Sequence, residues 1–307
     1  LEFVASRSMT THTSHTRPLD AAGMASTVFL CITWGFNQPA IKLAILEGVP
    51  PLLQCAIRST LATFIVLGVM RLRGLPIAER DGTLVAGIVA GVLFGLEFLF
   101  IYRGLIYTAA SRATLFIYLA PFFVVLGSRW FFPTDRFGPM QWAGLVLAFV
   151  GMIVAFGVPA PASSPHQLLG DLMMAVAALV WAATTLVIKA SSLARVSPEK
   201  TLLYQIVVCV PMVAIGALAF GERITQMPSA VALGSLAYQT LVVGTTFSVW
   251  FMLIVKFSAS RLSAFTFLTP LFGVAAGHFV LGEPLTPAFA LAVALVAAGL
   301  ILVNRPR

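Results

Sequence analysis

Long apolar stretches alternate with short polar turns along nearly the whole chain. A helix that crosses a bilayer needs about 20 mostly apolar residues. Breaking the chain at its charged residues, prolines and glycines leaves ten stretches of that length. The pattern therefore predicts an all-α integral membrane protein with ten transmembrane helices, over residues 22–46, 50–71, 83–105, 108–131, 138–157, 168–190, 200–221, 230–256, 260–281 and 285–303.

Composition supports this class and excludes others. Of the 307 residues, 59% are hydrophobic and 10% are charged, whereas soluble domains carry about a quarter charged residues. The net charge of +8 does not indicate nucleic acid, because the basic residues lie singly between uncharged runs. Cys31, Cys55 and Cys209 lie inside apolar runs, which indicates neither a disulfide framework nor a metal site. No cofactor is expected.

Lysine and arginine predict the orientation, because they accumulate on the cytoplasmic side of membrane proteins. Fourteen of the nineteen fall at one face, three fall at the other, and Lys42 and Arg58 lie inside spans. Both termini are therefore expected in the cytoplasm, in a bacterial inner membrane. The N-terminal tail, residues 1–21, starts with Leu1 to Ser8, which resemble a cloning scar, and lacks the apolar core of a signal peptide. Residues 304–307 form the C-terminal tail.

An internal repeat is the most informative pattern. The segment from Trp34 to Lys42 recurs 147 positions later, from Trp181 to Lys189. Residues 110–125 recur at 259–274, with eight identities in sixteen positions. The repeats are predicted as 22–157 and 168–303, joined by a linker over 158–167. Because five spans are an odd number, the second repeat is inverted, and such folds place a substrate cavity near the midplane. The alternative is a duplicated scaffold without a transport role.

The repeated residues also carry a resemblance to a known family. The matching features are Trp34-Gly35 with Lys42, Pro51 followed by Arg58, the Pro121 and Pro270 helices, and the Gly282-Glu283 turn. Over residues 22–303 the chain resembles the drug/metabolite transporter superfamily, in its ten-helix EamA-type branch, and within it the YddG-type amino-acid exporters. The resemblance implies a carrier of small metabolites with a central cavity, and the expectation of export rests on it alone. The halves are not exactly symmetric, since Leu186 is the counterpart of Pro39.

Charges inside a membrane span are costly and are therefore candidates for function. Arg58 and Glu97 each lie eight residues from the outer end of their spans, about 12 Å deep at 1.5 Å per residue. We expect Glu97 to meet Arg58 or Lys42, either as a tie between helices or as a gate or coupling site. Lys42 and Lys189 either extend to the headgroups or face the mouths of the cavity. His278 is either interfacial or a titrating group that assists proton coupling.

Polar and aromatic residues at mid-span define the predicted cavity. Pro39, Pro121 and Pro270 are candidate hinges, because proline removes a backbone donor from a helix. The threonines either bind substrate or bond to carbonyls of their own helix, and the aromatics either line the cavity or join the interfacial belt. The candidate cavity residues are Trp34, Asn37, Gln38, Lys42, Thr114, Tyr118, Trp181, Thr184, Thr185, Trp250, Thr266 and Thr269.

An aromatic wall with a few hydrogen-bonding groups favours neutral or aromatic amino acids, whereas phosphate would need clustered Lys or Arg. The expected function is a secondary carrier that works by alternating access, with other metabolites or drugs as alternative substrates.

An intramembrane enzyme is disfavoured because H-E-x-x-H and G-x-S-x-G motifs are missing. A channel is disfavoured because no filter-like loop is evident. The Gly87, Gly91 and Gly95 stripe favours helix packing within a monomer over dimerisation. The expected partners are a small-molecule substrate and the lipid bilayer.

Overall fold

The computed structural model describes residues 19–108, 110–132, 135–157, 162, 164–281 and 287–305. Ten helices in these ranges are long and apolar enough to cross a membrane, so the predicted all-α class and ten spans are confirmed. The predicted terminal tails, the linker and the Gly282-Glu283 turn lie largely outside the described residues. The helices are α1 (Ala21–Leu46), α2 (Pro51–Leu72), α3 (Leu84–Tyr107), α4 (Ala110–Ile117), α5 (Ala120–Phe131), α6 (Pro139–Phe156), α7 (Pro165–Ala190), α8 (Pro198–Ala219), α9 (Ala230–Lys256), α10 (Ala259–Phe265), α11 (Leu268–Leu281) and α12 (Pro287–Asn304), with a 3-10 turn at Ser192–Arg195.

The helices begin where the local sequence can satisfy free backbone groups. The first four N–H groups of a helix have no partner inside it. The side chains of Ser164, Ser197 and Ser229 accept one such N–H at the starts of α7, α8 and α9. Proline occupies the first turn of α2, α6, α7 and α8, where its missing N–H costs nothing. The turn residues that separate the apolar stretches thus also start the helices.

Two of the ten spans, those predicted over 108–131 and 260–281, each consist of two consecutive helices. The first break lies between α4 and α5, and the second between α10 and α11. At each break the backbone makes shorter-range bonds, such as Leu119 N–H to Phe116 O at 3.2 Å and Phe267 N–H to Ala264 O at 3.2 Å. Pro121 and Pro270 lie in the first turns of α5 and α11, because proline cannot continue the preceding helix.

Pro39 behaves differently from the other two predicted hinges, since α1 runs unbroken past it. Pro211 lies in the same way inside α8 and was not singled out from the sequence. The predicted hinge positions are therefore two helix breaks and one proline within a continuous helix.

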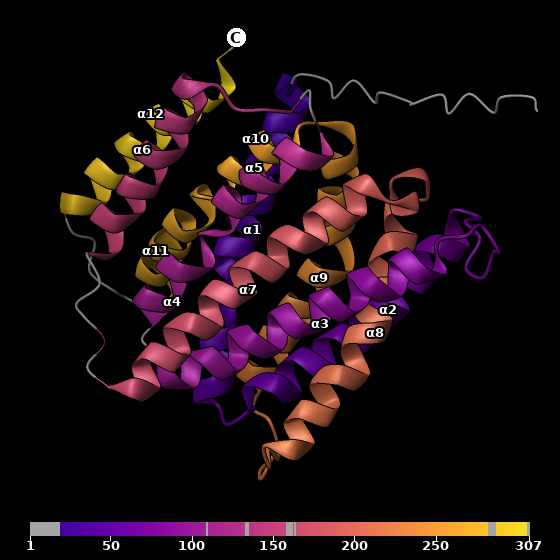
Figure 1. Ribbon diagram of the computed structural model, residues 1–307. Helices are drawn as coiled ribbons and strands as arrows, with labels where there is room; N and C mark the ends of the chain where they lie inside the picture. Colours follow the sequence, from indigo (N-terminus) through magenta and orange to yellow (C-terminus); the bar gives the residue numbers. More distant parts are fainter. Residues whose placement is uncertain are drawn as a thin grey trace, which may run out of the picture.

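The two repeats interleave. Helix α1 packs against α9, α10 and α11, and its counterpart α7 packs against α3, α4 and α5. The first helix of each repeat thus lies among helices of the other repeat. We call α1, α9, α10 and α11 the α1 group, and α3, α4, α5 and α7 the α7 group. Equivalent helices pair outside these groups, α2 with α8 and α6 with α12, and the start of α1 lies at the same end of the bundle as the end of α12 (Figure 1).

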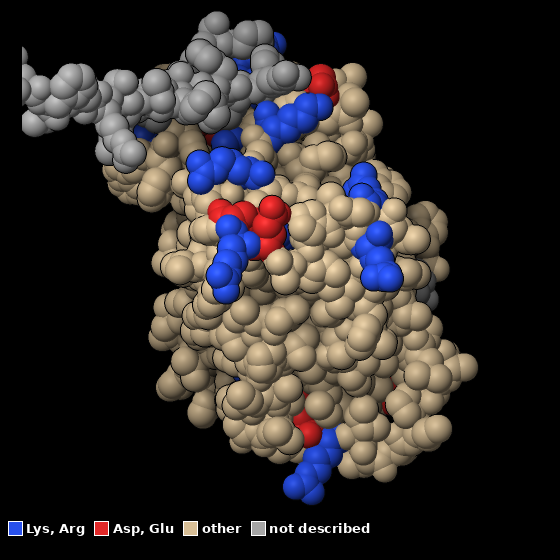
Figure 2. All heavy atoms as spheres, turned by 90° about the vertical axis from the view of Figure 1, so that its right-hand side faces the viewer, with Lys and Arg blue, Asp and Glu red and all other residues tan. Residues whose placement is uncertain are grey.

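On the face shown in Figure 2, charged side chains avoid a broad middle zone. Figure 2 shows Lys and Arg gathered toward the end that carries the termini, with a small charged group at the opposite end and mostly uncharged surface between them. Large apolar side chains in the middle of the spans, such as Phe64, Leu179 and Leu241, are exposed. This distribution is the one that a bilayer requires, because its hydrocarbon core solvates apolar groups and excludes charges.

The glycine stripe on α3 packs inside the chain, as predicted. A Cβ atom on Gly87 would lie 2.4 Å from the Tyr204 ring, and one on Gly91 would lie 2.6 Å from Val208, both on α8. Helices that approach this closely gain dispersion contacts that larger residues prevent. The stripe therefore holds α3 against α8 across the two repeats.

We expect Gly87→Ala to lower the thermal stability of the detergent-solubilised protein, because overpacking a close contact costs about 1–3 kcal/mol. Gly68→Ala is the matched control, since a Cβ atom there meets nothing within 4 Å. That control should raise stability slightly, because alanine favours the helix by roughly 0.5–1 kcal/mol over glycine. The melting temperatures of the two variants, measured by size-exclusion chromatography after heating, should shift in opposite directions. Equal shifts would contradict the packing role of Gly87.

Candidate functional site

The first aromatic cluster is centred on Trp34 of α1. Its indole N–H donates to the Thr246 hydroxyl on α9 at 2.9 Å, and its ring lies 5.4 Å from each of the rings of Phe247 and Trp250. Phe94 of α3 approaches Phe247 at 5.7 Å. Trp34 therefore contacts interior rings, and the cluster joins the α1 group to the α7 group.

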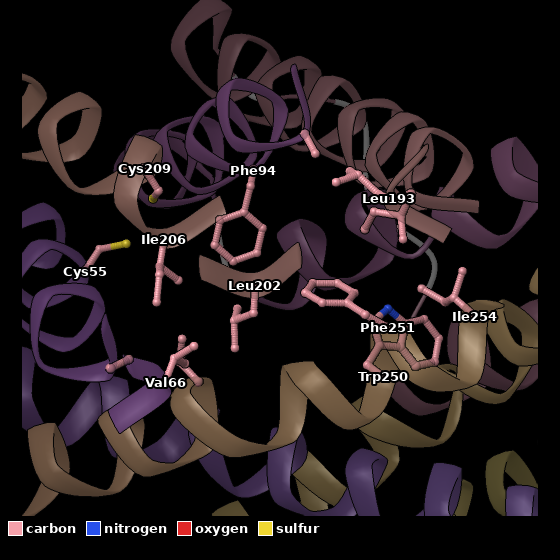
Figure 3. Close-up of a cluster of buried hydrophobic side chains, with 14 of the residues drawn as sticks. Cys55, Val66, Phe94, Leu193, Leu202, Ile206, Cys209, Trp250, Phe251 and Ile254 are labelled. Atoms are coloured by element: carbon pink, nitrogen blue, oxygen red, sulfur yellow. The ribbon is translucent and has the colours of Figure 1, made fainter. Parts of the chain in front are cut away.

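The surroundings of this cluster appear in Figure 3. Phe251 lies beside Trp250, Phe94 points toward Leu202, and Cys55 and Cys209 lie at the far end from Trp250. All of these residues are buried. The rings thus continue into a packed core made from both repeats.

The second aromatic cluster is centred on Trp181, the counterpart of Trp34. Its ring lies 5.9 Å from Tyr118, which lies 6.3 Å from Phe267. Tyr118 and Phe267 occupy the two helix breaks and equivalent positions of the repeat, 149 residues apart. Two equivalent residues that touch each other lie near the pseudo-two-fold axis that relates the repeats. This cluster is therefore a second contact between the two groups, at mid-depth.

The predicted hydroxyl ligands divide into two kinds. Thr184 and Thr185 donate to the carbonyls of Val180 and Trp181 on their own helix, and Thr266 donates to Ser263 O. These hydroxyls therefore follow the structural alternative, bonding within their own chain segment. Asn37 Oδ1 and Thr269 Oγ1, by contrast, are buried and accept no hydrogen bond within the described part of the chain. Thr114 is partly buried, and the Gln38 side chain lies outside the described part.

The expected ion pair of Glu97 is not formed. No described residue lies within ion-pair distance of its carboxylate, neither Arg58 nor Lys42. The Arg58 guanidinium lies over the rings of Phe98 at 4.5 Å and Tyr102 at 5.7 Å. Aromatic faces attract a cation because of their quadrupole, so they take the place that the prediction gave to Glu97.

Lys189 is buried and does not extend to the headgroups. Its ammonium is buried and donates to the carbonyls of Ile254, at 3.0 Å, and Phe257 at the end of α9. A cation is stabilised there because the last carbonyls of a helix carry partial negative charge. Lys42 is exposed near the end of α1, and His278 lies 5.2 Å from the Phe279 ring.

Two buried carboxylates were missed from the sequence. Asp171 of α7 accepts from the guanidinium of Arg112 and from the Thr108 hydroxyl at 2.6 Å. It lies inside an apolar stretch, so the rule that singled out Arg58 and Glu97 would have found it. Asp135, in the turn after α5, accepts from the Ser258 hydroxyl and from Ser260 N–H at 3.4 Å. Its turn position gave no signal.

The polar ties between the α1 group and the α7 group lie at one end of the bundle. Lys189 bonds α7 to the end of α9, and Asp135 bonds the turn after α5 to the start of α10. That end is the one that carries the start of α1 and the end of α12 (Figure 1). At the opposite end, Asp171 ties α7 to Arg112 of α4, inside the α7 group. In the described part of the chain, the ties that Lys189 and Asp135 make between the two groups therefore lie at the terminal end.

Two carboxylates at the terminal end have opposite electrostatics. Burial raises the pKa of Asp135 above its ordinary value, against the hydrogen bond from Ser258. The ammonium of Lys200, 2.6 Å away, lowers the pKa of Asp81, with help from the Thr83 hydroxyl. Asp81 lies in the turn between α2 and α3, so this second pair holds that turn against the start of α8.

Interleaved repeats, paired equivalent helices and ties at one end define a multi-pass membrane protein of the transporter class. The chain belongs to the EamA-like transporter family, which matches residues 21–157 and 168–305. It is 25% identical to a probable amino-acid metabolite efflux pump of Salmonella typhimurium, over 90% of this chain and 92% of that protein. It is 24% identical to the uncharacterized transporter YoaV of Bacillus subtilis, over 91% and 95%. A solved crystal structure with 22% identity covers 91% of this chain and 96% of its own, with a TM-score of 0.76, and shares the fold.

The pH dependence of stability tests the burial of Asp135. A raised pKa means that the folded protein holds the proton more tightly than the unfolded chain, so stability falls as pH rises from about 4 through the raised pKa. Asp135→Asn should therefore gain melting temperature relative to the parent protein as the pH rises above about 4, the ordinary pKa of an aspartate. Asp81→Asn should lose melting temperature relative to the parent protein over the same pH range. The lowered pKa of Asp81 means that its ionised form stabilises the fold at pH values above the ordinary pKa of an aspartate. Parallel curves for both variants would rule out this assignment.

Proposed function

We propose that this protein is a secondary carrier that moves small neutral or aromatic amino acids across the bacterial inner membrane by alternating access. The observation that carries the proposal is the pair of interleaved groups, which meet through aromatic rings at mid-depth and through polar ties at one end. A rocking motion of one group against the other would break the ties at that end while the rings remain the pivot. Inverted-repeat carriers work in this way.

The substrate class rests on the chemistry at mid-depth. The Trp34 and Trp181 clusters offer aromatic faces, and Asn37 Oδ1 and Thr269 Oγ1 offer unused hydrogen-bonding capacity. An amino acid with an apolar side chain needs both kinds of group. A relative named as an amino-acid metabolite efflux pump supports the same class and supports export. The alternative is a drug or another metabolite carried by the same fold.

The proposed orientation places both termini in the cytoplasm. The end of the bundle that carries the termini also carries most of the Lys and Arg in Figure 2, and such residues accumulate on the cytoplasmic side. The tied end is then cytoplasmic, so the ties would close the carrier on its cytoplasmic side. The α3 glycine stripe is used inside the chain, so we propose that the carrier works as a monomer.

Counterflow in proteoliposomes tests the function. Vesicles loaded with an unlabelled amino acid should accumulate the same labelled amino acid transiently and saturably. A steady current without saturation would support a channel instead. If the protein moves a cationic drug or a nucleoside but no amino acid from a full panel, it is a carrier and the proposed substrate class is wrong.

Trp34→Ala is expected to weaken transport of an aromatic amino acid by roughly two- to tenfold, because an aromatic pair contributes about 0.5–1.5 kcal/mol beyond its buried area. Trp130→Ala is the matched control, since this tryptophan is 75% exposed on α5 and should leave transport unchanged. The initial rate of counterflow at low substrate concentration measures the difference. Equal rates for the two variants would exclude Trp34 from the site.

A cross-link tests the ties at the terminal end. In Asp135→Cys with Ser258→Cys, a short bifunctional thiol reagent should abolish counterflow by fixing the two groups together, and cleavage of the link should restore it. Thr108→Cys with Asp171→Cys is the control, because this pair is joined within the α7 group. The native cysteines are buried. Full transport by the cross-linked first pair would contradict a gate at this end.

A further inference from the structure

Arg58 is a buried cation without an ionic partner among the described residues. Its side chain is 2% exposed, Nη2 lies 3.7 Å from Cys55 Sγ, and Nε makes no hydrogen bond. The ring faces of Phe98 and Tyr102 are its other contacts. Removing a guanidinium from water costs several kcal/mol unless a charge or hydrogen bonds compensate. An anion next to Arg58 would therefore be strongly stabilised.

Glu97 is the buried carboxyl next to the ring that holds Arg58. It directly precedes Phe98 on α3 and is 9% exposed, and the Arg58 guanidinium lies 4.5 Å from the centroid of the Phe98 ring. The ionisable groups on the other helices packed against α3 have different partners. Asp171 of α7 is bound by Arg112 of α4, and Lys189 of α7 is bound by carbonyls of α9. Arg58 is thus the cation available to Glu97.

The separation of these two groups points to two states of one site. An ionised Glu97 left unpaired at this depth would be strongly unfavourable, so a buried carboxyl in this position is neutral unless a cation contacts it. With the proton bound, Arg58 lies over Phe98 as observed. With the proton released, Arg58 and Glu97 form the ion pair that the observed geometry lacks. One proton bound or released thus exchanges a cation–aromatic contact for an ion pair.

We propose that Glu97 is the proton-binding site of the carrier and that Arg58 is the positive charge that pairs with it after release. This inference rests on the proposed carrier function and adds its coupling ion, a proton exchanged for substrate. The pairing also defines the role of Arg58, which positions and neutralises Glu97 without touching the substrate.

A continuous row of rings connects this site to the Trp34 cluster. Phe98 lies 4.8 Å from Phe94, Phe94 lies 5.7 Å from Phe247, and Phe247 lies 5.4 Å from Trp34. A substrate that displaces Phe94 therefore moves the ring that holds Arg58. This gives the two sites a physical link through a chain of packed side chains.

A row of polar groups leads from Arg58 toward the end of the bundle opposite the termini. Gln54 lies one helical turn before Arg58 on α2, and its amide oxygen accepts from Gln239 of α9 at 3.1 Å. Beside it, Glu222 accepts the Leu53 N–H at 3.0 Å in the turn after α8. These polar groups lie between Arg58 and that end of the bundle, the side from which a proton would have to reach Glu97.

Infrared difference spectroscopy of the purified full chain tests proton binding without transport. The carbonyl stretching band of a protonated carboxyl should be present in the parent protein and lost in Glu97→Gln. Glu79→Gln is the control, because Glu79 is exposed in the turn between α2 and α3 and should leave the band intact. Glu97→Asp should keep a band at a shifted frequency, which separates loss of the carboxyl from misfolding. A band unchanged by Glu97→Gln would overturn the proposal.

A pH gradient across proteoliposomes tests coupling. One pH unit is a tenfold proton ratio, so one-for-one exchange should support up to about tenfold accumulation of a labelled aromatic amino acid. Glu97→Gln and Arg58→Gln should lose this accumulation, and Glu97→Gln should retain counterflow without a gradient. Counterflow by the parent protein with no response to the gradient would overturn the coupling and leave the carrier function intact. An intact Glu97 band without any amino-acid counterflow would instead overturn the proposed function alone.

Discussion

Inside a bilayer no water is available to pair with a free amide or carbonyl group, so each backbone group needs a partner within the protein. This constraint explains where the chain is regular and where it is not. The two helix breaks, at Tyr118 and at Phe267, are covered by aromatic side chains and lie where the two groups of helices meet. Their backbone turns close with shorter-range hydrogen bonds. Irregular backbone is thus confined to the interior, at the position where a carrier needs its helices to bend.

Buried charged side chains also need partners within the protein, because no water is available to them. Several buried charges are satisfied by backbone or hydroxyl groups, as Lys189 is by the end of α9 and Asp135 is by Ser258. Arg112 and Asp171 form a conventional pair at the other end of the bundle. Among the described residues, Arg58 and Glu97 are the exception, because both are buried and no ion pair joins them. A fold that satisfies most of its buried charges and leaves one pair apart has a reason for the difference, and proton coupling supplies one.

Much of the fold could be predicted from the sequence, and less of the site. Ten apolar stretches and the recurrence of Trp34 at Trp181 were sufficient for the ten spans and the two repeats. Hinges were predicted at Pro121 and Pro270, but not that a new helix starts there, because a proline pattern does not distinguish a kink from the start of a new helix. The Glu97 pairing failed because depth in a span fixes height but not the direction of a side chain. Asp135 was missed because its burial depends on α10, which is more than a hundred residues away in the chain.

The interleaving of the repeats has a consequence for biogenesis. Helix α1 is synthesised first, but the helices that cover it, α9 and α11, emerge near the end of translation. Neither half contains the neighbours of its own first helix, so a ribosome-bound first half cannot complete its tertiary structure by itself. During insertion α1 must therefore be held in lipid or by the insertion machinery until the second half arrives, and premature termination leaves a fragment without a folded core.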